Sequence, residues 1–245
     1  MVGPVVLVHG LFGHLNDPLI LNAITEKDVF APDLLGYGEY RDQPLDDLTL
    51  EQQADHVAGY IRVRDLGPAN LVGHSVGGAV SVLLAANYPE LVATLTSVEG
   101  NFTLKDAFWS ARVAKQDLAE VEETIRGYKA DPNAWIAAAG VELNDWTKTL
   151  ARNWLDNQPA STIKAQARAV VEATGKPEYL ETIRKLMASG LPFHLLAGEL
   201  SREGWDVPDW GVKQATSNHD IPGTGHLMMA EKPVAFGEAI RRNCI

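Results

Sequence analysis

Short apolar runs alternate with amphipathic segments along the first hundred residues of the chain. A short, bounded apolar run predicts a buried strand, whereas a longer segment with apolar residues three or four positions apart predicts a helix. The elements expected in this region are a strand at 5–8, a strand near 27–31, a helix at about 50–65, a strand at 69–73, a helix at 78–88 and a strand at 92–98. Such alternation is typical of a parallel sheet with helices on both faces. We therefore expect an α/β fold, with a mostly parallel sheet flanked by helices.

The pattern changes between residues 103 and 189, where strand-like runs are missing and Ala, Glu, Lys, Gln and Trp are frequent. Segments 107–128 and 161–174 have the composition of helices. We predict that 103–189 is a helical cap inserted into a sheet domain made of residues 1–102 and 190–245. The elements expected after the cap are a strand at 193–197, a strand near 212–217 and a closing helix at 233–242.

The composition agrees with one large domain and narrows the class of partner. With 245 residues and 46% apolar content, the chain can bury one sizeable core. Its formal net charge of -11 argues against nucleic acid or an anionic membrane as partner, because both are approached through basic patches. The single cysteine, Cys244, excludes an intramolecular disulfide. With no basic leader and no long apolar stretch, we expect a soluble, cytoplasmic protein that acts on a small molecule; the sequence does not indicate its oligomeric state.

The segment Gly73-His74-Ser75-Val76-Gly77 places a serine between two glycines, directly after an apolar run and before a helical pattern. This arrangement is typical of a nucleophile elbow, in which a strained turn projects the serine hydroxyl away from the sheet. The turn also puts the Val76 amide at the start of a helix, where its hydrogen can point at a developing oxyanion. A glycine-rich turn after a strand is also ordinary packing, so the context of the motif matters.

Two further segments supply that context. Residues 9–13 form a glycine-containing loop after the first strand, and such a loop can aim a backbone amide at the same oxyanion. His226 lies in a glycine-containing loop near the C-terminus. The order along the chain is therefore amide loop, serine and histidine.

These stretches resemble those of the α/β-hydrolase fold superfamily. The similar segments are 5–13 (VVLVHGLFG), 28–40 (DVFAPDLLGYGEY), 71–90 (LVGHSVGGAVSVLLAANYPE), 191–200 (LPFHLLAGEL) and 221–233 (IPGTGHLMMAEKP). The resemblance implies that Ser75 is the nucleophile, His226 the base, and the amides of Leu11 and Val76 the oxyanion hole. Members of this family usually begin with an antiparallel pair of strands that has no counterpart here, so we expect a truncated sheet of six strands.

The family also implies an acid that orients the histidine, and here the sequence departs from the pattern. Ser201 stands where the acid usually lies, three residues after the glycine that ends the preceding strand. Some members carry the acid one strand earlier, and Glu99 follows the apolar run 92–98. We predict that Glu99 is the acid, because an unpaired carboxylate at a strand end would be expensive to bury. The alternatives are a Glu99 that is solvated or caps the next helix, and an acid drawn from the later carboxylates, Glu199, Glu203 and Asp206.

Aromatic residues in and around the cap are candidates for an apolar substrate pocket. The residues that we expect to line it are Phe12, Phe102, Trp109 and Trp135. An aromatic residue on a helix is more often a packing residue than a recognition residue, so we expect only some of them to meet the substrate. His9 is expected to bond backbone in the amide loop, and His74 to face away from the nucleophile. No His-Glu-x-x-His or Cys-x-x-Cys pattern occurs, so we expect no metal and no cofactor.

The function expected from these features is that of a carboxylesterase-like serine hydrolase. Its substrate would be a carboxylic ester, lactone or thioester of a small, largely apolar compound, cleaved through an acyl-enzyme on Ser75. Two alternatives remain, because this fold hosts many activities. The same residues could perform a lyase or proton-abstraction reaction, or the protein could bind a ligand without turnover; the serine at position 201 favours the latter.

Overall fold

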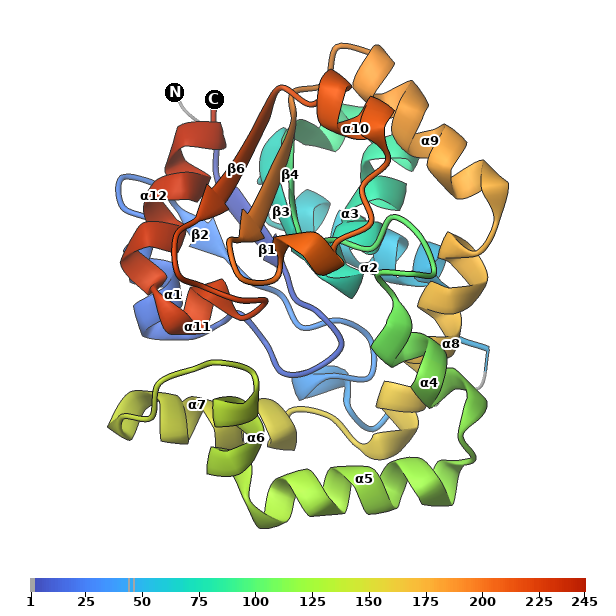
Figure 1. Ribbon diagram of the computed structural model, residues 1–245. Coiled ribbons are helices and arrows are strands. Elements are labelled where there is room, and N and C mark those ends of the chain that lie inside the picture. The colour runs from blue at the N-terminus through green and yellow to red at the C-terminus, as the bar shows by residue number, and fades with distance from the viewer. Residues whose placement is uncertain (1–2, 44, 46) are drawn as a thin grey trace.

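The computed structural model of the chain describes residues 3–43, 45 and 47–245. Its described strands form one parallel sheet in the order β2-β1-β3-β4-β5-β6. These strands are β1 (Val5–Val8), β2 (Val29–Phe30), β3 (Ala69–His74), β4 (Val92–Val98), β5 (Phe193–Gly198) and β6 (Ser217–Ile221). The prediction of a six-stranded, mostly parallel sheet flanked by helices is confirmed (Figure 1).

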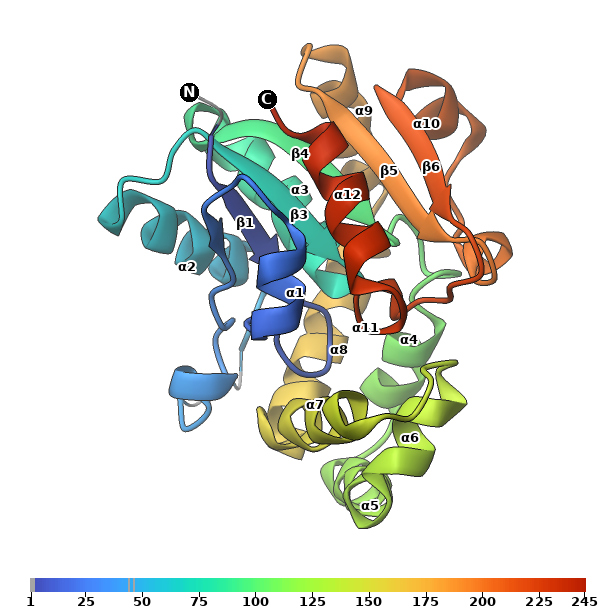
Figure 2. The ribbon, with the colours of Figure 1, turned by 90° about the vertical axis from the view of Figure 1, so that its left-hand side faces the viewer.

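Helices cover both faces of this sheet. They are α1 (Pro18–Ala23), α2 (Leu50–Val63), α3 (Val76–Asn87), α9 (Pro177–Ala188), α10 (Asp209–Gln214), α11 (Met228–Glu231) and α12 (Pro233–Asn243). Helices α1 and α12 pack together on one face and α2 and α3 on the other (Figure 2). Alternate residues of β1 point to opposite faces of the sheet. Val5 and Leu7 belong to the hydrophobic cluster on one face, and Val6 and Val8 to the cluster on the other. A strand buried on both faces therefore has a continuous apolar run.

The chain reverses its direction of travel across the sheet next to β1. From β1 it passes outward to β2, and then returns to the other side of β1 to form β3, which pairs with β1 from Val5↔Asn70 to Val8↔Gly73. The loops that follow β1 and β3 consequently leave the same edge of the sheet and diverge. In open α/β sheets, such a switch point at the carboxyl ends of the strands is where ligands bind.

Five helices lie across this edge of the sheet, between β4 and β5 in sequence. They are α4 (Phe108–Lys115), α5 (Leu118–Ala130), α6 (Pro132–Ala138), α7 (Asp145–Asp156) and α8 (Ala160–Thr174). Figure 1 shows them below the strand ends, and α9 then returns the chain to the sheet, where it packs on α3. We refer to α4–α8 as the inserted helices. They fall within the segment 103–189 predicted to be an insertion.

The inserted region contains one departure from the expected elements. The helix predicted at 107–128 is divided into α4 and α5. Asp117 accepts a hydrogen bond from the Glu120 amide, and the Glu120 side chain accepts one from the Asp117 amide. This capping box starts a new helix, because it satisfies backbone donors that a first turn leaves without partners.

The strand predicted near 212–217 is wrong. Residues 209–214 form the helix α10, and the strand β6 begins later, at Ser217. Most of β6 is exposed and polar, because it is the edge strand and pairs on one side only. A strand of this kind has no apolar run to predict it from. Among the described residues, no helix is long and apolar enough to cross a membrane.

Candidate active site

Ser75 occupies the turn between β3 and α3. Its backbone is strained, with φ 54° and ψ -123°, a conformation that a non-glycine residue adopts only when its surroundings hold it there. Gly73 and Gly77, on either side of this turn, have no room for a side chain. A Cβ on Gly77 would lie 2.2 Å from the Val8 carbonyl oxygen, and one on Gly73 would lie 2.4 Å from the Gly77 carbonyl oxygen. The motif therefore permits close packing of α3 against two strand ends, which fixes the direction of the serine side chain.

The loop after β1 lies directly against this turn. A Cβ on Gly10 would stand 3.1 Å from the Ser75 Cβ. Val76 is the first residue of α3, so its N–H has no acceptor within the helix. The Leu11 N–H has no hydrogen-bond acceptor among the residues that the structure describes. Two backbone donors are thus left without partners beside the serine, and they belong to the residues that the sequence analysis assigned to the oxyanion hole.

His9 holds this loop in place. Its Nε2 accepts a hydrogen bond from the Leu34 amide, and its Nδ1 lies 2.8 Å from the Gly10 carbonyl oxygen, to which it donates. Burial lowers the pKa of His9 to about 4, so the ring is neutral and keeps one donor and one acceptor. The predicted structural role of His9 agrees with these contacts.

Glu99 and His226 form the central polar pair of the site. Nδ1 of His226 donates to Oε2 of Glu99 over 2.6 Å, and this bond leaves Nε2 as the free nitrogen of the ring. The Glu99 side chain is only 5% exposed. Burial by itself raises the pKa of the carboxyl, but the bonds from His226, Ser201 and the Gly198 amide outweigh it, and the pKa is lowered. Glu99 is therefore an ionised acceptor that orients the imidazole.

Glu99 also shares a backbone property with Ser75. Its φ of 42° is positive, although Glu99 is neither glycine nor exposed. The strain is held by the Glu99 amide, which donates to the Leu196 carbonyl oxygen over 3.0 Å. Two strained non-glycine residues thus sit at the ends of adjacent strands, β3 and β4, facing the same site.

The other acid candidates have different partners. Glu199 accepts from the Gly223 amide, and Asp206 accepts from the Thr103 hydroxyl. Glu203 contributes to the wall of the cavity, and no hydrogen bond joins it to His226 within the described part of the chain. The structure therefore pairs His226 with Glu99 and not with a carboxylate of the later loop.

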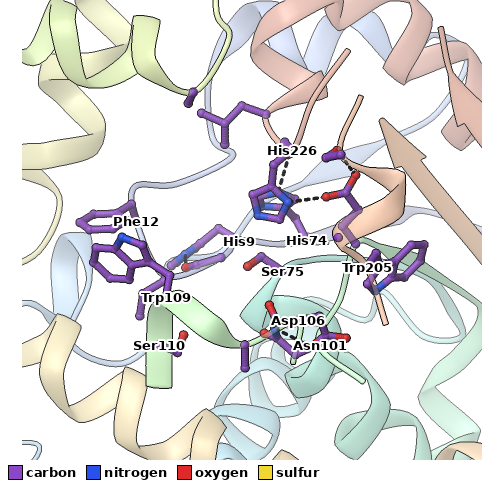
Figure 3. Close-up of a pocket in the computed structure, with 18 of the residues that line it drawn as sticks. His9, Phe12, His74, Ser75, Asn101, Asp106, Trp109, Ser110, Trp205 and His226 are labelled. Atoms are coloured by element: carbon purple, nitrogen blue, oxygen red, sulfur yellow. Dashed lines mark hydrogen bonds and ion pairs between the residues drawn. The ribbon is translucent and has the colours of Figure 1, made fainter. Parts of the chain in front are cut away.

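His74 corrects one expectation. It was expected to face away from the nucleophile, but it lines the same cavity as Ser75 and lies against His226, with ring centroids 4.6 Å apart (Figure 3). Its Nε2 donates to the His226 carbonyl oxygen over 3.0 Å. Burial, reinforced by the neighbouring His226, lowers the pKa of His74 to about 3. His74 is thus neutral, and its hydrogen bond holds the loop that carries His226.

A cavity of about 760 Å³ lies beside Ser75, and Glu99, His226 and His74 also line it. Phe12, Trp109 and Trp135 line it as predicted and pack edge to face, with Phe12 4.9 Å from Trp109 and 5.7 Å from Trp135 between ring centroids. Figure 3 shows Phe12 and Trp109 together, across the cavity from Trp205. The aromatic wall joins the loop after β1 to the inserted helices.

Phe102, the remaining residue expected at the pocket, does not line the cavity. It is 1% exposed and packs against Phe193 and Trp205, with ring centroids 6.5 and 5.8 Å away. The residue lies at the base of the insertion, where the chain leaves β4, so it is buried under the site instead of facing it. This pocket assignment is therefore corrected.

Ser75 and His226 border the same cavity, but no hydrogen bond links their side chains among the described residues. Such bonds often shorten only when a substrate binds, so their length without substrate does not decide the role of the pair. The described part of the chain contains no group of three or more His, Cys, Asp or Glu side chains placed to hold a metal ion.

A family model, described as the alpha/beta hydrolase family, matches residues 5–239. The chain belongs to the alpha/beta hydrolase family. A carboxylesterase structure from the ammonia-oxidizing thaumarchaeon Nitrososphaera gargenis has the same fold, with a TM-score of 0.74 at 19% identity. The alignment covers 98% of this chain and 88% of that one.

Curated relatives of this hydrolase-family chain match over different lengths. An uncharacterized protein of Mycobacterium bovis is 33% identical over 268 residues, which covers 98% of this chain and 75% of that protein. Ethanol acetyltransferase 1 of Eremothecium cymbalariae is 36% identical over 101 residues, which covers 39% of this chain. The match spans only 27% of the length of that acetyltransferase, so the similarity is confined to one part of it.

One residue of this alpha/beta hydrolase was not assigned a role from sequence. Ser201 was seen only as a missing acid, yet its hydroxyl donates to Oε1 of Glu99. The acid and the residue at its usual position are therefore in contact, across the adjacent strands β4 and β5. The substitution of a donor for a carboxylate at position 201 is the signal that could have indicated this pairing.

Proposed function

We propose that this protein is a serine hydrolase that cleaves a carboxylic ester, lactone or thioester of a small, largely apolar substrate through an acyl-enzyme on Ser75. The observation that carries the proposal is the 2.6 Å bond from His226 to the buried Glu99, in the cavity that also contains the strained Ser75. A histidine held in this way presents its second nitrogen as a base. The carboxylesterase among the structural neighbours supports the fold but not the substrate.

In the proposed mechanism, the Ser75 hydroxyl attacks the carbonyl carbon while Nε2 of His226 takes its proton. The oxygen of the tetrahedral intermediate accepts hydrogen bonds from the Leu11 and Val76 amides, which lack other partners. The intermediate collapses, the bond to the alcohol or thiol breaks, and His226 returns the proton to that leaving group. A water molecule, deprotonated by His226, then attacks the acyl-enzyme. The second tetrahedral intermediate collapses with cleavage of the bond to the Ser75 oxygen, His226 returns the proton to that oxygen, and the acid is released.

Glu99 has an electrostatic role in both steps. Because its carboxylate is ionised and bonded to Nδ1 of His226, it stabilises the imidazolium that forms whenever Nε2 holds the extra proton. The bond also fixes the ring in one tautomer. The absence of a carboxylate at position 201 favoured a binding protein without turnover. Because Ser201 donates a hydrogen bond to Glu99, the proposed acid, its presence no longer argues against catalysis.

The test is covalent labelling with a fluorophosphonate, followed by peptide mass spectrometry of the adduct. This probe requires an activated serine and makes no assumption about the substrate. We expect rapid labelling of Ser75 in the unaltered chain and none in Ser75→Ala. Folded protein that resists the probe while the hydrolysis of an ester panel also stays at background would overturn the proposal.

A further inference from the structure

The loop after β1, which carries the Leu11 amide, has few backbone hydrogen bonds. Its first part is held from the sheet domain, because the Tyr37 hydroxyl donates to the Leu11 carbonyl oxygen over 2.8 Å. In residues 12–16, the backbone groups of Gly13 are the only ones with hydrogen-bond partners among the described residues. The conformation of this second part therefore depends on what holds Gly13.

Both polar backbone groups of Gly13 are bonded to consecutive residues at the end of the inserted helix α7. The Gly13 amide donates to Oε1 of Gln158 over 3.0 Å, and Nδ2 of Asn157 donates to the Gly13 carbonyl oxygen over 3.1 Å. Gln158 is 0% exposed, and its amide nitrogen donates to the Trp154 carbonyl oxygen over 2.9 Å. This second bond fixes the orientation of the Gln158 amide, so its oxygen is directed at Gly13.

Helix α7 contacts the same loop in two further ways. Gly13 has a φ of 75°, and a Cβ on it would lie 2.4 Å from Cγ of Trp154, so the indole fills the space beside it. At the far end of the loop, Nε1 of Trp146 donates to Oδ1 of Asp17, the N-cap of α1, over 3.1 Å. Figure 2 shows α7 below α1, which this loop precedes.

Asn157 is itself attached to the sheet domain. Its Nδ2 also donates to Oδ1 of Asp33 over 3.1 Å, and its carbonyl oxygen accepts from the Gly38 amide over 2.8 Å. Asp33 and Gly38 lie in the segment that follows β2. The end of α7 is therefore joined to the loops after both β1 and β2, and it is a fixed point from which Gly13 can be held.

Gln158 and Asn157 do not line the cavity in the described part of the chain, whereas Leu11 and Phe12 do. Neither of the two amide side chains can therefore contact a substrate in that cavity. Both side chains are also uncharged, so they have no long-range electrostatic effect on the reacting groups. Any influence that they have on the reaction has to act through the loop that they hold.

We propose that Gln158 and Asn157 are positioning residues for the oxyanion hole. By holding Gly13, they fix the direction of the Leu11 N–H, two residues earlier, so that an inserted helix sets one of the two oxyanion donors. This assignment rests on the proposed function and adds to it. The Val76 amide belongs to α3 and is placed independently of α7. Loss of the α7 contacts should therefore weaken the oxyanion hole without abolishing it.

The test compares the same substitution at two buried glutamines of the inserted helices. Gln158→Met removes the acceptor for the Gly13 amide and keeps the length of the side chain. Gln166→Met is the matched control, because Gln166 of α8 is also 0% exposed and accepts from Nε2 of Gln53 over 2.7 Å. Among the described residues, Gln166 has no hydrogen bond to the loop after β1 and does not line the cavity. Thermal unfolding of both variants would measure their loss of stability.

Three compounds with the same acyl chain separate the tetrahedral state from ordinary binding. The ester is p-nitrophenyl pentanoate, which reports turnover. With 1,1,1-trifluorohexan-2-one, the Ser75 oxygen adds to the ketone carbon, the serine proton passes to His226, and the carbonyl oxygen becomes an oxyanion that needs the hole. Hexan-2-one lacks the activating fluorines and binds without this addition.

We expect Gln158→Met to lower kcat/KM for the ester by about ten- to hundredfold, because one oxyanion donor is displaced. The inhibition constant of the trifluoromethyl ketone should rise by a similar factor, and that of hexan-2-one should stay within about threefold. Gln166→Met should leave all three values within about threefold. Equal losses in the two methionine variants, or an unchanged inhibition constant of the trifluoromethyl ketone in Gln158→Met, would overturn the positioning role.

Two further variants keep the test decisive. Gln158→Glu retains an acceptor for the Gly13 amide, and burial keeps the new carboxyl protonated, so it should recover most of the loss. Asn157→Leu, at a half-buried position, should lower kcat/KM and weaken the trifluoromethyl ketone by about three- to tenfold. If Gln158→Met does not fold, unchanged values in Asn157→Leu would overturn the proposal. An unaltered chain that resists both the fluorophosphonate and the trifluoromethyl ketone would reject the hydrolase mechanism, and the positioning role with it.

Discussion

The strand ends and the aromatic wall of the cavity are held by different forces. Ser75 and Glu99 have strained backbones, and each is fixed by hydrogen bonds and by close packing between neighbouring strands. Phe12, Trp109 and Trp135 are half-buried and meet through ring contacts between separate elements. Strained backbone persists only where its surroundings determine it fully, whereas packed side chains tolerate substitution if volume is kept. Changes at the strand ends should therefore abolish chemistry, and changes in the wall should alter only substrate preference.

The largest effect is expected from Ser75→Ala. The substitution removes the nucleophile and adds no bulk, so kcat for an ester should fall by about 10⁴-fold or more while the fold is retained. Steady-state assays with p-nitrophenyl esters, together with thermal unfolding of the same samples, would measure this. Turnover within tenfold of the unaltered protein would show that the strand-end serine does not carry the reaction.

Glu99→Gln should have the next largest effect. Glutamine keeps the size of the side chain but loses the charge that stabilises the protonated His226, so kcat should fall by roughly 10²- to 10⁴-fold. Asp206→Asn is the matched control, because Asp206 bonds to Thr103 and Lys105 and not to the histidine. We expect the control to change kcat by less than about twofold. A larger loss in the control than in Glu99→Gln would move the acid to the later loop.

This contrast also explains which features could be predicted from the sequence. The turn at Ser75 requires glycines at positions 73 and 77, and buried parallel strands require apolar runs, so both leave a local signature. Glu99 could be predicted from its place after the buried strand β4. The pairing of Glu99 with His226 depends on two loops far apart in sequence, and only the family resemblance indicated that such a pair should exist.

Other features could not be predicted, because they depend on tertiary contacts alone. Phe102 and Trp109 are both aromatic residues near the start of the insertion, yet one packs under the site and the other lines the cavity. His74 lines the cavity because the His226 loop lies over it, which no feature of the elbow motif encodes. The polar edge strand β6 has no apolar pattern, so its position was wrongly predicted.

Ser201→Ala should reduce kcat less than Ser75→Ala or Glu99→Gln does. It removes one of the hydrogen bonds that lower the pKa of Glu99, so that pKa should rise towards the ordinary value of 4.5. Because the pKa of Glu99 is lower in the folded than in the unfolded chain, its ionisation stabilises the fold above the ordinary pKa. This contribution is lost as the pH falls from the ordinary pKa through the folded-state pKa. In Ser201→Ala the contribution should be smaller, and its loss should be complete at a higher pH.

Urea denaturation between pH 7 and pH 3.5 would measure this difference. We expect Ser201→Ala to lower the free energy of unfolding at pH 7 by about 1 kcal/mol, and kcat by a few-fold, because one hydrogen bond to a carboxylate is lost. Ser201→Thr, which keeps the hydroxyl, should restore both values. Equal pH profiles for the alanine and serine proteins would show that the Ser201 hydroxyl does not influence Glu99.

The smallest effects on turnover are expected for substitutions of Trp109, in the aromatic wall, and of Phe102, in the layer beneath it. Comparing these two aromatic residues distinguishes a residue that contacts the substrate from one that only packs in the core. Trp109→Leu widens the cavity beside Phe12, so the ratio of kcat/KM for a long and a short acyl ester should change by about three- to tenfold. Phe102→Leu leaves the cavity intact but weakens the contacts with Phe193 and Trp205, at a cost of about 1–2 kcal/mol in the free energy of unfolding. Its acyl-length ratio should stay within about twofold of the unaltered protein, because Phe102 does not line the cavity. In the opposite result, Phe102→Leu would change the acyl-length preference and Trp109→Leu would change only the stability. That result would mean that Phe102, and not Trp109, contacts the substrate when it binds.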